Sequence, residues 1–392
     1  MIWNTANDIA SSATLTVDGA SLTVGNGGQL TIQGSSSIDN ATAVTTDGNL
    51  VLKKDMTIKS IDGSGKITAD GSTLTFDSNS ALGDNLNFAS NNSSTAIING
   101  ITDTTKADKL VSKISGGTND NLTVNINGTN SNANINVDGT QISNLNFSGN
   151  VNYGGEITGA GNITNTGNLT ITGNQSGFNG AYTQNSSTAN TNINTSANLF
   201  GGTKNFNKGF VTISAGTIDY TGVKLGNAIL NQTITDSNLV NLDSSNIEFT
   251  GTGNSTGHVG ITGGNINLSK IDNGHENWLV FNGSNVKLAD EDYTGGTIYN
   301  LNSNSTLDLM EKDSINYQIK DYVFDNLLAA DATTKLNFNI KINSDANGNY
   351  LTTDTVKINT GYGDFKLGDV YITGEENGQR GGYSTQKDVM QG

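Results

Sequence analysis

The chain has 392 residues and a formal net charge of −16, and only 14% of its residues are charged, against roughly 25% in soluble domains. The acidic balance and the single arginine, Arg380, argue against nucleic acid as a partner, because affinity for phosphates depends on Lys and Arg contacts. Cysteine is absent, which excludes disulfides and thiolate metal sites, and no apolar run approaches the ~20 residues that span a bilayer. We therefore expect no membrane insertion by this chain.

Composition also favours a hydrogen-bonded β-structure. Proline is absent, although average usage near 5% would give roughly twenty prolines, and proline cannot donate to a β-ladder. The low apolar content, 33%, leaves disorder over the whole length as an alternative. The repeated alternation of Leu, Ile, Val and Thr argues against it.

Residues 1–98 contain the clearest strand signals. Short runs with strict apolar alternation are closed in most cases by Asp-Gly, Gly-Asn or Gly-Gly, which supply turns with positive φ. These runs are residues 14–19, 21–28, 29–34, 49–55, 56–60, 66–71 and 73–78. These strands are too short for a sandwich, so we predict the three faces of a β-solenoid with coils of roughly 20–25 residues. Outward Asn side chains can form ladders in such a fold.

Residues 101–117 interrupt this rhythm and predict a short surface helix. The expected buried positions follow i, i+3, i+4, i+7 spacing: Ala107, Leu110, Val111 and Ile114. Asp103 or Thr104 is the expected N-cap, and Gly116 lies beyond the end. An irregular strand is the alternative.

Strands resume over residues 121–153, and residues 154–184 are the most regular stretch of the chain. There, short runs around Ile157, Ile163 and Leu169–Ile171 alternate with Gly and Asn corners. A polar loop is predicted at 185–196, followed by a second copy of the pattern at 207–222. Further strands are expected near Ile229, Ile247, Ile261–Ile266, Leu279–Phe281 and Val286–Leu288.

From about residue 306 the predicted strands become longer and more apolar. Residues 335–343 alternate over a full strand, and residues 353–361 are its predicted partner after a turn. We therefore expect two parts: a solenoid over 1–305 and a longer-stranded end section over 306–392, continuous with it. The chain itself is expected to be an excised segment of a longer protein.

Three carboxylate clusters and two histidines are the candidate catalytic or metal-binding residues of the chain. The clusters are Asp290-Glu291-Asp292, Glu311 with Asp313, and Glu375-Glu376. Paired carboxylates could serve a glycoside hydrolase, but all three clusters lie in or near predicted turns, where solvated corners are the preferred interpretation. His258 and His275 have no companion cluster and are interpreted as surface residues. We assign no catalytic, metal or cofactor-binding residue and expect no cofactor.

Four aromatic residues have two possible interpretations, an exposed binding patch or packing inside the solenoid. Phe178, Tyr182, Phe206 and Phe210 could form an exposed patch that stacks on sugars, or could pack in the core and corners of the solenoid. Core packing is the preferred interpretation.

Residues 159–180 resemble the passenger-domain repeat of bacterial autotransporters. The matching positions are Gly159, Gly161, Ile163, Gly167, Leu169, Ile171, Gly173, Asn174 and Gly180. This copy has Ile163 where Leu is usual, and residues 207–222 resemble the end of one repeat leading into the next. The resemblance implies an all-β, right-handed parallel β-helix that is secreted through the outer membrane and displayed at the bacterial cell surface, most often as an adhesin.

The favoured function is therefore a non-enzymatic extracellular surface protein that displays loops for adhesion or self-association. Its partner would be a host or neighbouring-cell surface, a matrix component, a glycan or another copy of the chain. The candidate binding loops are 101–117 and 185–196, since function on repeat scaffolds is often carried by insertions. One alternative is a structural filament or surface-layer subunit. The other is a carbohydrate-active β-helix enzyme that uses Asp290 or Asp292.

Overall fold

The computed structural model describes residues 15–194, 200–214 and 221–233 without interruption. Outside these stretches it describes residues 2–3 and 6–8 and, from residue 239 to 382, separate strands with a few flanking residues. The chain forms two compact units, residues 1–204 and 205–392.

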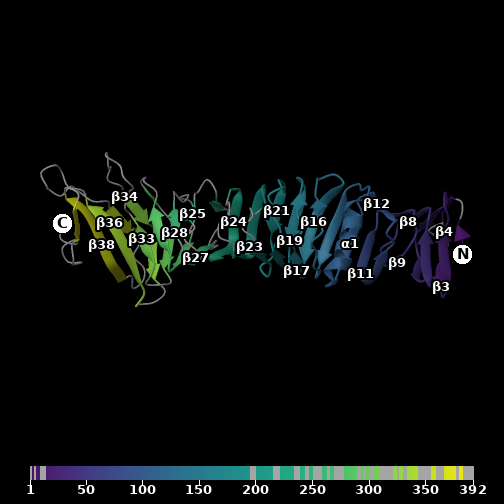
Figure 1. Cartoon of the computed structure of the whole chain (residues 1–392), viewed down its shortest axis with the longest axis horizontal. Helices are drawn as coiled ribbons and strands as arrows, with labels where there is room; N and C mark the ends of the chain where they lie inside the picture. The colour runs from purple at the N-terminus through teal and green to yellow at the C-terminus, as the bar shows by residue number, and fades with distance from the viewer. Residues whose placement is uncertain are drawn as a thin grey trace. The chain divides into compact units, whose positions relative to one another are not determined.

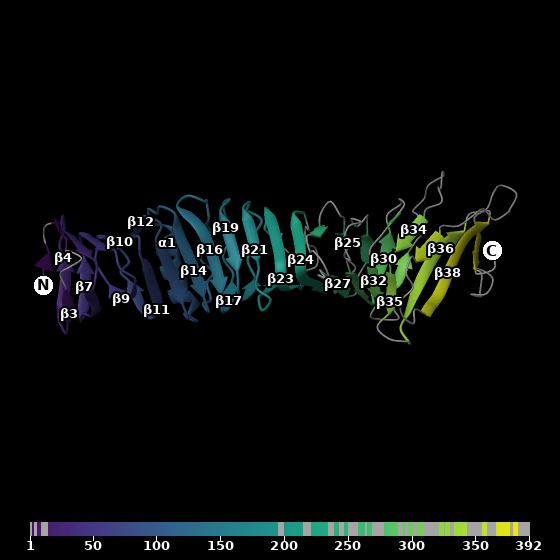
Figure 2. The same ribbon diagram turned by 180° about the vertical axis from the view of Figure 1, so that it is seen from behind.

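The first unit is a parallel β-solenoid, which confirms the predicted fold class. Figures 1 and 2 show its coils stacked in chain order from β4 to β21. Its strands are β1 (Ile2–Trp3), β2 (Ala6–Asp8), β3 (Thr16–Asp18), β4 (Ser21–Val24), β5 (Gln29–Ile32), β6 (Ser37–Asn40), β7 (Ala43–Thr46), β8 (Asn49–Leu52), β9 (Met56–Ile61), β10 (Lys66–Asp70), β11 (Thr73–Leu82), β12 (Asn87–Asn91), β13 (Thr95–Asn99), β14 (Leu122–Asn127), β15 (Ile135–Asn136), β16 (Ile142–Ser148), β17 (Asn150–Tyr153), β18 (Ile157–Thr158), β19 (Asn162–Asn165), β20 (Asn168–Ile171), β21 (Ala181–Gln184) and β22 (Asn190–Ile193).

Each coil has three faces, as the alternating pattern predicted. In one coil the first face is β16, the second is β17 and the third is β18; in the next coil β19 pairs with β16 and β20 with β17. Lys66 pairs with Asn49, 17 residues earlier, and Asn190 with Asn168, 22 residues earlier. Coil length therefore varies while the parallel ladder continues.

Alternation places one set of side chains inside the coil. Leu145, Ile163 and Tyr182 are in register on consecutive first-face strands, and all three are fully buried. Burying a Leu or Ile side chain stabilises by about 1.5–3 kcal/mol. Because each coil is thin, this burial depends on the neighbouring coils above and below.

The corner glycines meet two different needs. Gly19, in an Asp-Gly corner, has a φ of +60°, as the turn signals predicted. Gly180 has no such φ, but a Cβ there would overlap the carbonyl oxygen of Gly161 in the preceding coil. In this corner, glycine is required by the close stacking of two backbones.

Helix α1 (Thr104–Ser115) confirms the predicted helix and its boundaries. Asp103 is the N-cap and accepts a hydrogen bond from the Lys106 backbone N–H at 3.2 Å, and Gly116 is the C-cap. The four predicted apolar positions are buried. The insertion lengthens the coil to 28 residues, from Ala96 to its partner Val124, without a shift in first-face register.

The predicted loop at 185–196 is wrong for part of its length. Residues 190–193 form β22, which pairs in parallel with β20. Thr191 and Ile193 point inward and are buried. The run has only one apolar residue at its inward positions, so its polarity concealed the strand. Residues 195 and 196 lie outside the described residues.

Where the structure describes their pairing, the strands of the second unit are also parallel, apart from one hairpin. Its strands are β23 (Thr203–Ile213, beginning at the end of the first unit), β24 (Val223–Thr233), β25 (Leu239–Leu242), β26 (Ile247–Phe249), β27 (His258–Thr262), β28 (Asn265–Leu268), β29 (Trp278–Asn282), β30 (Asn285–Leu288), β31 (Tyr293–Thr294), β32 (Thr297–Asn300), β33 (Thr306–Asp308), β34 (Asp321–Phe324), β35 (Asn326–Ala329), β36 (Lys335–Ile342), β37 (Thr355–Ile358), β38 (Lys366–Glu376) and β39 (Gln379–Gly382). Strands β38 and β39 form the antiparallel hairpin.

The predicted pairing of 335–343 with 353–361 is wrong. β36 pairs in parallel with β33 and β38, whereas β37 pairs with β34 in another sheet. In a solenoid, strands adjacent in sequence lie on different faces, so consecutive runs do not form a hairpin. The ladder from β30 through β33 to β36 crosses residue 305 without interruption. The domain boundary placed there stays a prediction.

Candidate functional site

Amide side chains form rows along the outside of the first unit, as expected for stacked Asn. On the first face, Asn162 donates to Asn144 at 3.4 Å, and Asn144 donates to the Thr123 hydroxyl at 3.4 Å. On the second face, Asn168 donates to Asn150 at 2.9 Å. In each case the amide N–H of the later coil donates to an oxygen of the earlier coil. The rows fix the orientation of each amide and tie consecutive coils together.

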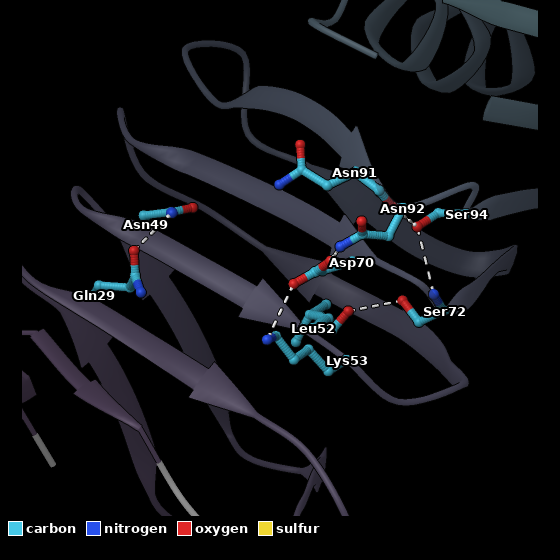
Figure 3. A network of polar contacts seen from close by, with 9 residues as sticks. All are labelled: Gln29, Asn49, Leu52, Lys53, Asp70, Ser72, Asn91, Asn92 and Ser94. Atoms are coloured by element: carbon cyan, nitrogen blue, oxygen red, sulfur yellow. Dashed lines mark hydrogen bonds and ion pairs between the residues drawn. The ribbon is translucent and has the colours of Figure 1, made fainter. Parts of the chain in front are cut away.

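A polar column on the third face and its corner joins several coils in the same way (Figure 3). Asn49 of β8 donates to Gln29 of β5 at 3.2 Å. Asp70, at the end of β10, pairs with Lys53 at 3.3 Å and accepts a hydrogen bond from Asn92. With Lys53 almost half exposed, this ion pair contributes little to stability, and its main effect is to fix the corner.

Helix α1 interrupts the second face, and its lysines contact the preceding coil. Lys106 donates to the carbonyl oxygen of Ser78, and Lys113 donates to those of Asp84 and Leu86 at 2.8 and 2.7 Å. Lys109 forms an ion pair with the Asp84 side chain, whose pKa is lowered by this lysine. The lysine ammonium groups therefore donate to backbone carbonyl oxygens of the preceding coil, beside the position that a second-face strand would occupy.

Asp108 makes the corresponding contacts with the following coil. One carboxylate oxygen accepts from the Ser131 hydroxyl at 2.8 Å and from the backbone N–H groups of Asn132 and Ala133 at 2.6 and 3.1 Å. The helix is thus held on both sides by charged side chains. Its exposed positions are Thr105, Lys109 and Ser112.

The coil interior contains a buried polar network. Thr191 donates to Gln184 at 2.6 Å, so the Tyr182 hydroxyl must donate to Thr191 at 2.5 Å, and Asn165 donates to Thr191 at 3.1 Å. Burial raises the pKa of Tyr182, with the bonds from Thr191 and Asn165 acting in the opposite direction. The pKa of Tyr153 is also raised, first by burial and then by the charge of Asp108. These phenols are structural donors, enclosed in the core.

A groove of about 380 Å³ opens on the outside of the first unit. It lies between β6 and β7 on one side and β9 on the other, and it is lined by residues 38–39, 41–45 and 57–62.

The predicted chemical clusters are not brought together by the structure. Asp290–Asp292, Glu311, Asp313 and His275 lie outside the described residues. Glu375 and Glu376 are the backbone register partners of Arg380 and Gln379 in the β38–β39 hairpin. His258 is the first residue of β27. Within the described residues, no group of three or more His, Cys, Asp or Glu side chains could hold a metal ion.

The aromatic residues lie in the core, with one exception. Phe178, Tyr182 and Phe206 are fully buried, which confirms core packing for these three, and Phe210 is 46% exposed. Tyr182 stacks on Phe200 at a centroid distance of 4.6 Å, and Phe178 meets the same ring edge-on. The sugar-stacking patch is therefore wrong.

Sequence reasoning missed the groove and the charged anchors of α1. The i, i+3, i+7 spacing of Lys106, Lys109 and Lys113 could have indicated one basic side of the helix. The groove had no comparable signal, because residues 37–46 were not recognised as strands. Lys204 was also missed; it is buried, and its ammonium group donates to the carbonyl oxygens of Phe200 and Gly202 at 2.6 and 3.0 Å.

Within the residues that the structure describes, no helix has the length and apolar character needed to cross a membrane. No protein-family model matches the sequence, and searches of curated proteins and of solved structures found no match.

Proposed function

We propose that this chain is a non-enzymatic scaffold of the bacterial cell surface that presents a binding surface for adhesion, with α1 as the presented element. The passenger-like repeat at 159–180 supports the surface location. The stacked coils support the role of a scaffold, because their backbone groups are paired in ladders and their side chains in amide rows.

The observation that carries the proposal is the anchoring of α1. Lys106, Lys113 and Asp108 hold the helix to the coils on both sides, while Thr105 and Ser112 are directed to solvent. A helix fixed in this way presents its outer face in one orientation, so a partner does not have to order it on binding. The partner would be a host or neighbouring-cell surface, a matrix component or a glycan on either.

The second predicted binding loop is reduced to the turn at 185–189, because β22 follows it. This turn provides a matched comparison with α1. Ser187 and Thr188 are exposed there, as Thr105 and Ser112 are on the helix.

The test measures binding of beads coated with the purified chain to cultured epithelial cells and to immobilised extracellular matrix. The double variant Thr105→Glu/Ser112→Glu should reduce bead binding about tenfold, since it places two charges in the contact surface. The matched variant Ser187→Glu/Thr188→Glu should bind like the unmodified chain. Binding unaffected by the α1 variant would refute the assignment of α1.

Two further measurements test the class of function. An antibody against the chain should label intact cells of the source organism without permeabilisation. The purified chain should show no turnover on a panel of polysaccharides with Ca²⁺; turnover abolished by Asp290→Ala or Asp292→Ala would replace the adhesion proposal with the enzyme alternative.

A further inference from the structure

Two of the three ladders in the first unit stop at the same coil boundary. β6 is the last strand of the first-face sheet β3–β6, and β7 is the last strand of the second-face sheet β1–β4–β7. The next coil begins with β9, which pairs with β11 on its other side. Only the third-face ladder, β5–β8–β10, crosses this boundary without interruption.

A single bridge closes one end of the gap. The Thr46 N–H donates to the Asp62 carbonyl oxygen at 2.8 Å, and the Asp62 N–H donates to that of Val44 at 3.0 Å. No backbone hydrogen bond joins β6 to β9 in this fully described part of the chain. The two strand edges therefore separate from one another away from the bridge and form the sides of the groove.

The floor of the groove is apolar. Ile38 and Val44 are each 7% exposed, whereas Val17 and Leu22, their counterparts one coil earlier, are 4% and 1% exposed. The opening in the wall thus gives solvent limited access to core side chains. The volume, about 380 Å³, lies within the roughly 300–1,000 Å³ of ligand-binding pockets.

We propose that this groove binds an extended peptide, which adds as a strand to the open edge of β9. The edge of β6 is partly used by its own turn, because the Ala41 N–H donates to the Ile38 carbonyl oxygen at 3.2 Å and the Asp39 N–H donates to the Ser37 hydroxyl at 3.2 Å. An open strand edge presents a row of N–H and C=O groups, and the chemistry that complements such a row is another extended backbone. Apolar side chains on one side of the peptide would cover Ile38 and Val44. β9 has six residues, which sets the length of the paired segment.

The charged residues that line the groove favour a peptide with a basic side chain. Asp39 and Asp62 line the groove with two carboxylates, against one ammonium group, Lys59. A peptide with a basic residue complements this rim. A second copy of the chain is disfavoured as the occupant, because each copy carries a net charge of −16. The proposed groove is distinct from α1 and does not depend on the adhesion proposal.

The probe is a fluorescein-labelled hexapeptide, Lys-Thr-Val-Thr-Val-Lys, titrated into the full chain and followed by fluorescence anisotropy. Its backbone control has the same sequence with alternate amide nitrogens methylated, which removes donors but keeps the side chains. The groove variant Ala43→Trp fills the opening from an exposed position. Ala160→Trp is the matched protein control, an exposed alanine in a corner of another coil.

Saturable binding is expected, weakened at least about tenfold by Ala43→Trp and by backbone methylation and unchanged by Ala160→Trp. The Asp39→Asn variant should weaken binding by a smaller factor that decreases with added salt. Circular dichroism should show that all variants keep the strand signal. Absence of saturable binding, or equal binding of the methylated peptide, would overturn the proposal. So would a concentration-dependent dimer that Ala43→Trp abolishes, since the occupant would then be a second copy.

Discussion

At the scale of single residues, Thr46 and Thr191 are equally buried, but their hydroxyl groups differ in their hydrogen bonds. The Thr46 hydroxyl is buried without a hydrogen-bond partner, whereas the Thr191 hydroxyl has three. A buried polar group without a partner loses its water contacts and gains nothing in return. The same substitution should therefore have opposite effects at the two positions.

Thr46→Val should raise the free energy of unfolding by about 1 kcal/mol, because it replaces an unpaired hydroxyl with a methyl group of the same shape. Thr191→Val should lower it by about 1–3 kcal/mol, because Tyr182 and Asn165 lose their acceptor and Gln184 loses a donor. Urea denaturation followed by circular dichroism measures both. Destabilisation by Thr46→Val would show that its hydroxyl has a partner after all.

The buried tyrosines predict a loss of stability at alkaline pH. The pKa values of Tyr153 and Tyr182 are raised in the folded chain, so the stability that they contribute is complete below the unfolded value of roughly 10. Above that pH the unfolded chain releases these protons and the folded chain retains them. Unfolding free energy should then fall by about 1.4 kcal/mol per pH unit for each tyrosine.

The Tyr153→Phe/Tyr182→Phe variant isolates this effect. It should be less stable than the unmodified chain at pH 8, since the Ala133 carbonyl loses its donor, yet its stability should decrease less steeply above pH 10. Urea titrations between pH 8 and 11.5 supply both slopes. Identical slopes would contradict the assigned burial of the two phenols.

At the scale of elements, α1 depends on Asp108 as a substitute for the backbone of a missing strand. Asp108→Ala removes the acceptor from two backbone N–H groups and one hydroxyl, which should cost about 2–3 kcal/mol of unfolding free energy. Hydrogen exchange at Asn132 and Ala133 should accelerate in the same variant. The comparison is Asp103→Ala, which removes only the N-cap, should cost about 1 kcal/mol, and should leave exchange at those two residues unchanged.

The same element shows why some structure could be predicted from sequence. Helix α1 combines apolar residues at helical spacing, an Asp N-cap and a Gly C-cap, so three independent signals agree. β22 offers no such agreement, because its inward residues include Thr191, which is stabilised by partners from other strands. β6 and β7 were missed for a related reason: their outward side chains are polar or small, and each has one buried aliphatic residue.

The groove was beyond sequence reasoning for a further reason. It results from the absence of pairing between β6 and β9, and pairing between coils depends on residues far apart in the chain. The carboxylate clusters were identified because acidic residues lie next to one another in the sequence. Such proximity does not show whether their side chains come together in one site. The peptide-binding proposal therefore depends on topology, whereas the adhesion proposal began from the repeat motif.

For the first unit as a whole, the interrupted ladders predict a step in local stability. Stacked coils are stabilised mainly by their nearest neighbours, so a boundary crossed by one ladder instead of three should be weak. Amide exchange in increasing urea should show β3 to β7 losing protection before β14 to β20, with the change located between β7 and β9. A gradual decline from the first coil onward would instead indicate ordinary fraying.

The outward amide rows also have a direction. Asn162 donates to Asn144, which donates to Thr123, and Asn92 donates to Asp70 in the same sense from later to earlier coil. An ionised carboxylate can only accept hydrogen bonds, so it fits the earliest position of a row, as Asp70 does where it accepts from Asn92. In a middle position it could not donate to the preceding coil. Substitution along these rows is consequently asymmetric: Asn→Asp is tolerated at one end and breaks the row anywhere else.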